Sequence, residues 1–120
     1  VAESMALLQN STLVIHGIGR ADTMAHQRRL SADILEMLSK KNAVGEAFGD
    51  FFDFEGRTVW QASTVSATLS HQPTGSKMVA VAAGEKKAEA IIASTRHDPH
   101  DSLITDESAA RRIIALLEEN

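Results

Sequence analysis

Short apolar runs alternate along this chain with segments whose apolar residues recur at helical spacing. The apolar runs lie at residues 12–15, 78–82 and 102–105. The segments of helical spacing lie at residues 22–29, 31–38, 86–95 and 107–120. Runs that are continuous rather than alternating are typical of strands covered on both faces. Strands alternating with helices predict an α/β fold, a parallel sheet with helices on both faces.

Other segments predict a smaller strand pair and a further helix. Residues 48–52 and 58–60 flank a four-residue stretch that ends in glycine, which predicts a hairpin. Residues 62–69 alternate weakly, as a half-exposed strand would. Residues 1–8 have helical composition without a start signal, which predicts the tail of a longer helix.

Polar residues before three of the predicted helices are candidate N-caps. Asp22 or Thr23 precedes the first helix, Ser31 the second and Asp106 the last. Oxygen-bearing side chains of these types accept hydrogen bonds from the free backbone amides of a first helical turn. We therefore expect these helices to begin at these positions.

Composition excludes several classes of function. The 120-residue chain has a formal net charge of -4 and only scattered basic pairs, so we expect no nucleic-acid binding by this chain itself. It has no cysteine, which excludes disulfides, thiolate metal sites and thiol catalysis. No apolar run approaches the roughly 20 residues of a membrane-spanning helix. We expect a cytoplasmic protein without membrane contact.

Glu46 is the most informative polar residue, because it stands among small and aromatic residues with Gly45 before it and Gly49 three positions later. A carboxylate in such surroundings must find hydrogen-bond donors or take up a proton. One interpretation is a grip on a polar ligand such as a sugar hydroxyl. The other is a turn whose acid caps nearby backbone amides, and the pattern alone favours this turn.

The carboxyl ends of the predicted parallel strands supply a second group of candidates. Ligands of open parallel sheets bind beyond these ends. Gly17, Gly84 and Asp106 follow the three apolar runs. Lys87 falls in the first turn of its helix, where an ammonium group and free amides could meet an anion. The alternative for Lys87 is a solvated surface lysine.

The remaining motifs do not predict a dinucleotide-binding, metal-binding or catalytic site. The Gly17-Ile18-Gly19 run lacks the third glycine of a dinucleotide-binding fingerprint. The run at 97–101 offers four potential metal ligands, but its proline and polar character favour a surface turn. No nucleophile motif or convincing catalytic set is found. We therefore expect no metal, no cofactor and no enzymatic activity.

Seven short motifs occur together in the order typical of one family. They are His16-Gly17-Ile18-Gly19, Met24-Ala25 with Arg28-Arg29, Ala43-Val44-Gly45-Glu46-Ala47-Phe48-Gly49, Phe52-Asp53, Ala80-Val81-Ala82, Lys87-Ala88-Glu89-Ala90-Ile91 and Leu103-Ile104-Thr105-Asp106-Glu107. Together they resemble the effector-binding domain of SorC-type bacterial transcription regulators, within that family the glycolytic branch. The resemblance extends from about Leu7 to Leu116.

The resemblance implies a fold similar to ribose-5-phosphate isomerase and glucosamine-6-phosphate deaminase, here incomplete. Residues 1–120 would form the C-terminal part of a sugar-phosphate-binding domain without its DNA-binding domain. The implied function is that of a repressor's ligand sensor, which binds a phosphorylated sugar such as fructose 1,6-bisphosphate and thereby controls DNA binding. The alternative is a fragment of an isomerase- or deaminase-like enzyme, with Glu46 or Asp106 as general base.

The resemblance also implies roles for individual residues. Glu46 would accept hydrogen bonds from sugar hydroxyls, while Lys87 and one of Arg28 and Arg29, with Arg28 favoured, would meet phosphate. The full expected ligand-binding set is Gly17, Arg28, Arg29, Gly45, Glu46, Gly84, Lys87 and Asp106. The expected partners are the sugar effector, further copies of the chain, and DNA only through a domain that this chain lacks.

Overall fold

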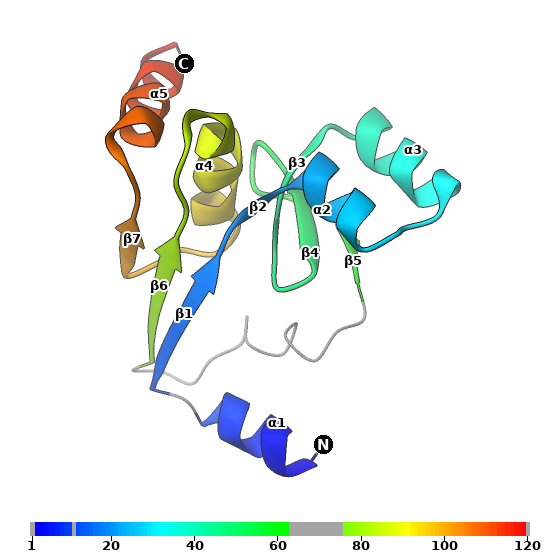
Figure 1. Ribbon diagram of the computed structural model, residues 1–120, viewed down its shortest axis with the longest axis vertical. Coiled ribbons are helices and arrows are strands. Elements are labelled where there is room, and N and C mark those ends of the chain that lie inside the picture. The colour runs from blue at the N-terminus through cyan, green and yellow to red at the C-terminus, as the bar shows by residue number, and fades with distance from the viewer. Residues whose placement is uncertain (1, 11, 63–75, 120) are drawn as a thin grey trace.

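The computed structural model describes residues 2–10, 12–62 and 76–119, which form two sheets on either side of one helix (Figure 1). The helices are α1 (Ala2–Gln9), α2 (Ala21–Gln27), α3 (Ala32–Lys40), α4 (Ala88–His97) and α5 (Glu107–Glu118), with the 3₁₀ helix η2 (Glu85–Lys87) before α4. The strands are β1 (Leu13–Gly17), β2 (Gly19–Arg20), β3 (Ala43–Ala47), β4 (Asp50–Asp53), β5 (Thr58–Gln61), β6 (Lys77–Val81) and β7 (Ser102–Ile104). Most of the weakly alternating segment at 62–69 lies outside the described residues.

The three predicted apolar strands form one parallel sheet in the order β1-β6-β7. Helices α4 and α5 pack on one of its faces, where Ala80 is fully buried between Ile18, Ile91 and Ala109. The small side chains let the helices approach the strands closely. The prediction of an α/β fold with a parallel sheet is confirmed.

The opposite face of the parallel sheet has no helical cover in the described part of the chain. Ile15 of β1 is 65% exposed and Ile104 of β7 is 57% exposed, and both share this face with Val81 of β6. Parallel sheets are normally buried on both faces, and these strands have the continuous apolar composition of such sheets. The expected two-sided cover is therefore present on one side only, as in an incomplete three-layer fold.

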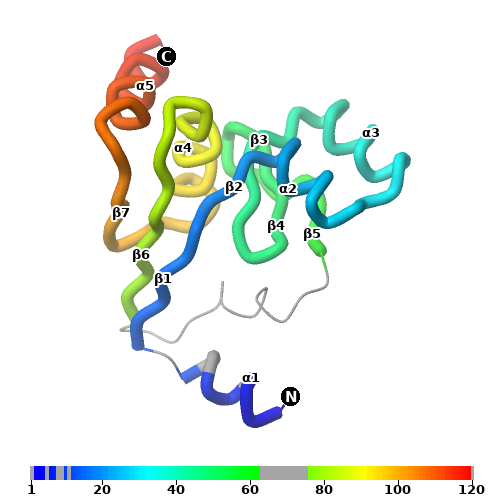
Figure 2. Tube along the Cα trace, in the orientation of Figure 1, coloured from blue at the N-terminus to red at the C-terminus, as the bar shows by residue number. Residues whose placement is uncertain are grey.

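The second sheet is antiparallel, in the order β2-β3-β4-β5. Phe51 and Phe52 of β4 are both fully buried because the sheet is covered on both sides. Phe51 packs with residues of α2 and α3, whereas Phe52 packs against Ala93 of α4. Helix α4 therefore lies between the two sheets (Figures 1 and 2), and α1 and α5 lie towards opposite ends of the long axis.

The predicted hairpin is confirmed for β4 and β5, but β3 was not predicted. β3 consists of Ala43–Ala47, of which only Val44 strongly favours strands, and it forms because β2 and β4 pair with it on both sides. Phe48 and Gly49 connect β3 to β4 with φ angles of 55° and 86°. Two consecutive positive φ angles are typical of a tight hairpin turn.

The helix starts follow the predicted caps in two of three cases. Ser31 accepts a hydrogen bond from the amide of Ile34, and Asp106 accepts one from Ala109. The prediction for α2 was wrong, because this helix begins at Ala21, directly after β2, and Arg20 at its N-cap makes no side-chain cap. Asp22 instead lies inside the first turn, where its Oδ1 atom accepts a hydrogen bond of 2.7 Å from the amide of Thr23.

Candidate functional site

Glu46 is held almost completely inside the β3–β4 hairpin, with 4% of its surface exposed. Its Oε1 atom accepts a hydrogen bond of 2.8 Å from the amide of Gly49, across the turn. The same atom accepts a second bond of 2.8 Å from Nη2 of Arg28. Among the described residues none donates to Oε2, which lies near Gly19 at the start of β2. Oε1 therefore caps the turn, and Oε2 accepts no hydrogen bond from the described residues.

Arg28 and Arg29 have different surroundings although they are neighbours. Arg28 is partly buried, and its Nε atom is buried without a hydrogen-bond partner in the part of the chain that the structure describes. Arg29 is exposed and takes a positive φ of 53° just after α2. Of the two arginines, Arg28 is the one that meets Glu46.

The carboxyl ends of β1, β6 and β7 meet at one edge of the parallel sheet. Gly17 ends β1, Gly84 follows β6, and Asp106 follows β7. Both carboxylate oxygens of Asp106 accept from the amide of Gly84, at 3.1 and 3.2 Å. Bonds from the amides of Ala109 and Gly84 lower the pKa of Asp106. Asp106 thus ties the loop after β6 to the start of α5.

Lys87 ends η2, at the same edge. Its backbone amide donates to the carbonyl of Gly84 at 3.0 Å, which fixes the start of the helix. The residue is half-buried, and the described residues include no ion-pair partner for its ammonium group. A cation that is not neutralised at this edge is suited to an anionic group of a ligand.

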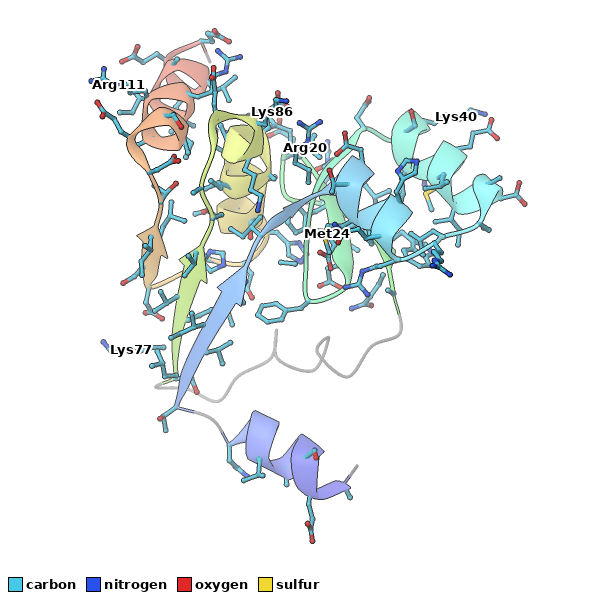
Figure 3. All side chains as sticks on the ribbon, viewed as in Figure 1. Arg20, Met24, Lys40, Lys77, Lys86 and Arg111 are labelled. Carbon is cyan, nitrogen blue, oxygen red and sulfur yellow. The ribbon has the colours of Figure 1, made fainter. Side chains whose placement is uncertain are left out.

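The neighbouring Lys86 belongs to a different part of the surface. It lines a cleft of about 540 Å³ with Arg20, Glu89 and Arg112, and Figure 3 shows Lys86 and Arg20 close together above the sheets. Acidic and basic groups are mixed in this cleft. None of Glu46, Arg28 and Lys87 lines it, so this cleft is not the predicted site.

Two of the predicted glycines have different environments. A Cβ atom on Gly45 would lie 2.6 Å from Cε1 of Phe52 and 3.1 Å from Cα of Ala90. Gly45 is therefore required for the close approach of β3 to α4. A Cβ atom on Gly17 would come no closer than 3.8 Å to a neighbouring atom, the carbonyl oxygen of Val81, so Gly17 leaves open space at the sheet edge.

The histidine-rich run that was considered for metal binding separates in space. His97 bonds to Gly56 and Asp50, whereas His100 bonds to His16 at 2.9 Å between their Nε2 atoms. In the described residues no three histidine, aspartate or glutamate side chains are placed to hold a metal ion. The contact of His97 with Asp50 was not predicted from the sequence, since the two residues are 47 positions apart and no local pattern connects them.

No helix among the described residues is both long and apolar enough to span a membrane.

Comparison with known proteins identifies the family. Residues 1–115 match the family model described as "Putative sugar-binding domain". The chain is 39% identical over 115 residues to the central glycolytic genes regulator of Priestia megaterium and 34% identical over 114 residues to that of Bacillus subtilis. Each match covers 95% of this chain, but only 33% and 34% of the respective relatives.

Solved structures agree with these sequence matches. A SorC family transcriptional regulator from Enterococcus faecalis has a TM-score of 0.82 and 41% identity, over 94% of this chain and 46% of that one. A transcriptional regulator from Streptococcus pneumoniae has a TM-score of 0.72 and 28% identity, over 93% and 44%. The chain thus spans about a third of the curated relatives and just under half of these solved chains.

These relatives are regulators of transcription and not enzymes, in agreement with the prediction from the sequence. The family model and the two groups of relatives cover nearly the whole chain. The chain belongs to the sugar-binding domain family of SorC-type bacterial transcription regulators.

Proposed function

We propose that the chain binds a phosphorylated sugar between the β3–β4 hairpin, which holds Glu46 with Arg28, and the carboxyl ends of the parallel strands, where Lys87 is found. We propose fructose 1,6-bisphosphate as a ligand of this class. The observation that carries the proposal is the burial and hydrogen bonding of the Glu46 carboxylate. This carboxylate is buried and held by Arg28 and Gly49 through one oxygen. Its second oxygen has no donor among the described residues and is suited to a sugar hydroxyl.

Two cations of the proposed site suit the phosphate groups of such a ligand. Arg28 keeps an unused Nε donor beside Glu46, and Lys87 follows Gly84 at the end of β6. Guanidinium and ammonium groups are the side chains that proteins use for phosphate. Open backbone at Gly17 and Gly84 leaves room for a ligand to approach, and Asp106 supports the Gly84 loop. Arg29 remains a candidate for a more distant phosphate, because it is exposed beside Arg28.

The chain is proposed to be the C-terminal part of an effector domain. The bare face with Ile15, Val81 and Ile104 is the surface that the remainder of such a domain would cover. DNA binding would belong to a separate domain, which the ligand controls by shifting the population of a homo-oligomer. As a regulator of bacterial transcription, the intact protein would act in the cytoplasm.

Calorimetry on the intact natural polypeptide that contains this chain tests the ligand. We expect fructose 1,6-bisphosphate to bind, and Glu46→Gln and Lys87→Ala each to weaken binding at least about tenfold, the effect of losing one hydrogen bond to a charged group. Glu36→Gln and Lys86→Ala are the matched controls, since Glu36 is exposed on α3 and Lys86 lines the other cleft. Equal affinity of all four variants and the wild type would contradict the proposed site.

A further inference from the structure

His97, in the last turn of α4, forms two contacts that a neutral histidine cannot both make when Asp50 is ionised. Its Nδ1 atom lies 2.9 Å from the carbonyl oxygen of Gly56, and its Nε2 atom lies 3.2 Å from Oδ2 of Asp50. A carbonyl and an ionised carboxylate only accept hydrogen bonds, while a neutral imidazole carries a single N–H. Both contacts are therefore satisfied only when the His97–Asp50 pair holds one additional proton, whichever residue carries it.

The surroundings favour this protonated pair. The side chains of His97 and Asp50 are 19% and 8% exposed, and the ring of Phe52 stacks on that of His97 at 4.9 Å. A buried carboxylate needs a cation or a proton nearby. The carbonyl ends of a helix attract positive charge, and His97 lies in the last turn of α4.

The other charged groups around this pair are engaged elsewhere. On α4, Arg96 donates to the carbonyl of Phe54 and lies 3.8 Å from Glu55 in the turn between β4 and β5. On the same turn, Asp53 bonds to Arg57. Asp98 follows His97 directly at the end of α4. Asp50 is thus the acidic group in direct contact with the His97 ring within the described residues.

Asp50 connects His97 to the candidate ligand site. It follows Gly49 in the tight turn of the β3–β4 hairpin, and the amide of Gly49 donates to Oε1 of Glu46. His97 therefore fastens the turn that supplies one of the two donors to Glu46. Lys87 directly precedes α4 in the chain. The position of α4 therefore affects both the Glu46 carboxylate and the Lys87 ammonium group.

We propose that His97 is a positioning residue of the sugar-phosphate site, which holds the Glu46 turn through Asp50 when the His97–Asp50 pair carries its additional proton. This inference rests on the proposed function. Loss of the proton leaves one of the two acceptors without a donor, so the turn loosens and Glu46 is less well placed. Ligand affinity then falls as the pH rises, and by linkage the ligand promotes proton uptake at this pair.

The test is the affinity of the intact protein for fructose 1,6-bisphosphate at about pH 6.5 and about pH 8.5, across much of the range in which histidine changes charge. The ligand's own phosphates titrate near pH 6, so the wild type is compared with His97→Gln rather than judged alone. We expect His97→Gln to bind about fivefold more weakly at the lower pH, the effect of about 1 kcal/mol for one hydrogen bond, and to lose part of the wild-type pH dependence. His26→Gln, on the exposed side of α2, is the control and should behave as the wild type.

The outcomes separate the two proposals. Absence of binding by the wild type at both pH values would overturn the proposed function and this inference with it. Binding by the wild type with an identical ratio of affinities in His97→Gln would overturn this inference alone. Nitrogen-15 spectra of the histidine rings in the wild type give an answer even where the variant fails to fold. We expect the His97–Asp50 pair in the complex to retain its proton to a higher pH than in the free protein, and an unchanged titration would overturn the proposal.

Discussion

Arg28 and Glu46 stand 18 positions apart in the chain and meet at 2.8 Å between Nη2 and Oε1. The two side chains differ in burial, since that of Glu46 is 5% exposed and that of Arg28 is 28% exposed. The carboxylate has therefore lost most of its hydration, and it depends on Arg28 and the Gly49 amide to compensate. Removal of either partner should affect folding as well as ligand binding.

Replacement of Arg28 by alanine should destabilise the fold, and replacement of Arg29 should not. In Arg28→Ala the Gly49 amide is the one donor to the buried Glu46 carboxylate that remains among the described residues. We expect the free energy of unfolding to fall by an amount on the order of 1–3 kcal/mol. Arg29→Ala removes an exposed side chain, for which changes within about 0.5 kcal/mol are usual. Urea unfolding of the two variants of the intact protein measures the difference. Equal midpoints would show that the ion pair does not stabilise the folded state.

A methyl group at Gly45 should not fit, whereas one at Gly17 should. In Gly45→Ala the new carbon meets backbone of α4 at Ala90 and the ring of Phe52, so overpacking by about 1–3 kcal/mol is expected. In Gly17→Ala the nearest atom lies at an ordinary contact distance of 3.8 Å. Thermal unfolding compares the two. A Gly45→Ala protein that is as stable as Gly17→Ala would contradict the close packing of β3 on α4.

Asp106 should make stability depend on pH in the acid range. Its pKa is lowered below the ordinary value of 3.8 by the amides of Ala109 and Gly84. A carboxyl group with a lowered folded-state pKa contributes stability above the unfolded value, and this contribution is lost as the pH falls through the folded value. Asp106→Asn, which can still cap α5, should therefore be less stable than the wild type at neutral pH and approach it in acid.

The measurement for Asp106 is the difference in unfolding free energy between wild type and variant from about pH 7 to about pH 2, the range that spans carboxyl titration. Asp33→Asn is the control, because Asp33 is an exposed acid in the first turn of α3. A difference for Asp106→Asn that stays constant over this range would contradict the lowered pKa.

Ile15 tests whether the bare sheet face is covered in the intact protein. If the remainder of the domain packs there, Ile15→Lys should destabilise the intact protein by several kcal/mol, about the cost of a buried unpaired charge. Gln61→Lys, on an exposed strand position of the other sheet, should have little effect. Unfolding by denaturant distinguishes them. Equal stability of the two variants would show that this face is open to solvent.

The final helix tests the proposed oligomer. Ile113 packs on the core, but Ile114 and Leu117 are 57% and 49% exposed on the outer side of α5. Apolar side chains that cluster on an outer surface are typical of interfaces. Ile114→Glu combined with Leu117→Glu should lower the association state in sedimentation, while Arg111→Glu on the same helix should not. Unchanged sedimentation of the double variant would exclude this surface as the interface.

The sequence by itself determined the α/β class, the three parallel strands, the capping of α3 and α5, and the family. These follow from local information, because continuous apolar runs, cap residues and ordered motifs are visible over a few adjacent positions. Strand β3 and the start of α2 were not predicted from sequence, since pairing with neighbours overrides weak local preference there.

Only the tertiary structure decided how the site residues meet. It selected Arg28 over Arg29 as the partner of Glu46, gave Gly45 a packing role, and joined His97 to Asp50 across 47 positions. Hydrogen bonds and desolvation act over a few ångströms in space and leave no periodic trace along the chain. The sequence could therefore name the charged residues of the site, but their contacts depend on how the two sheets pack around α4.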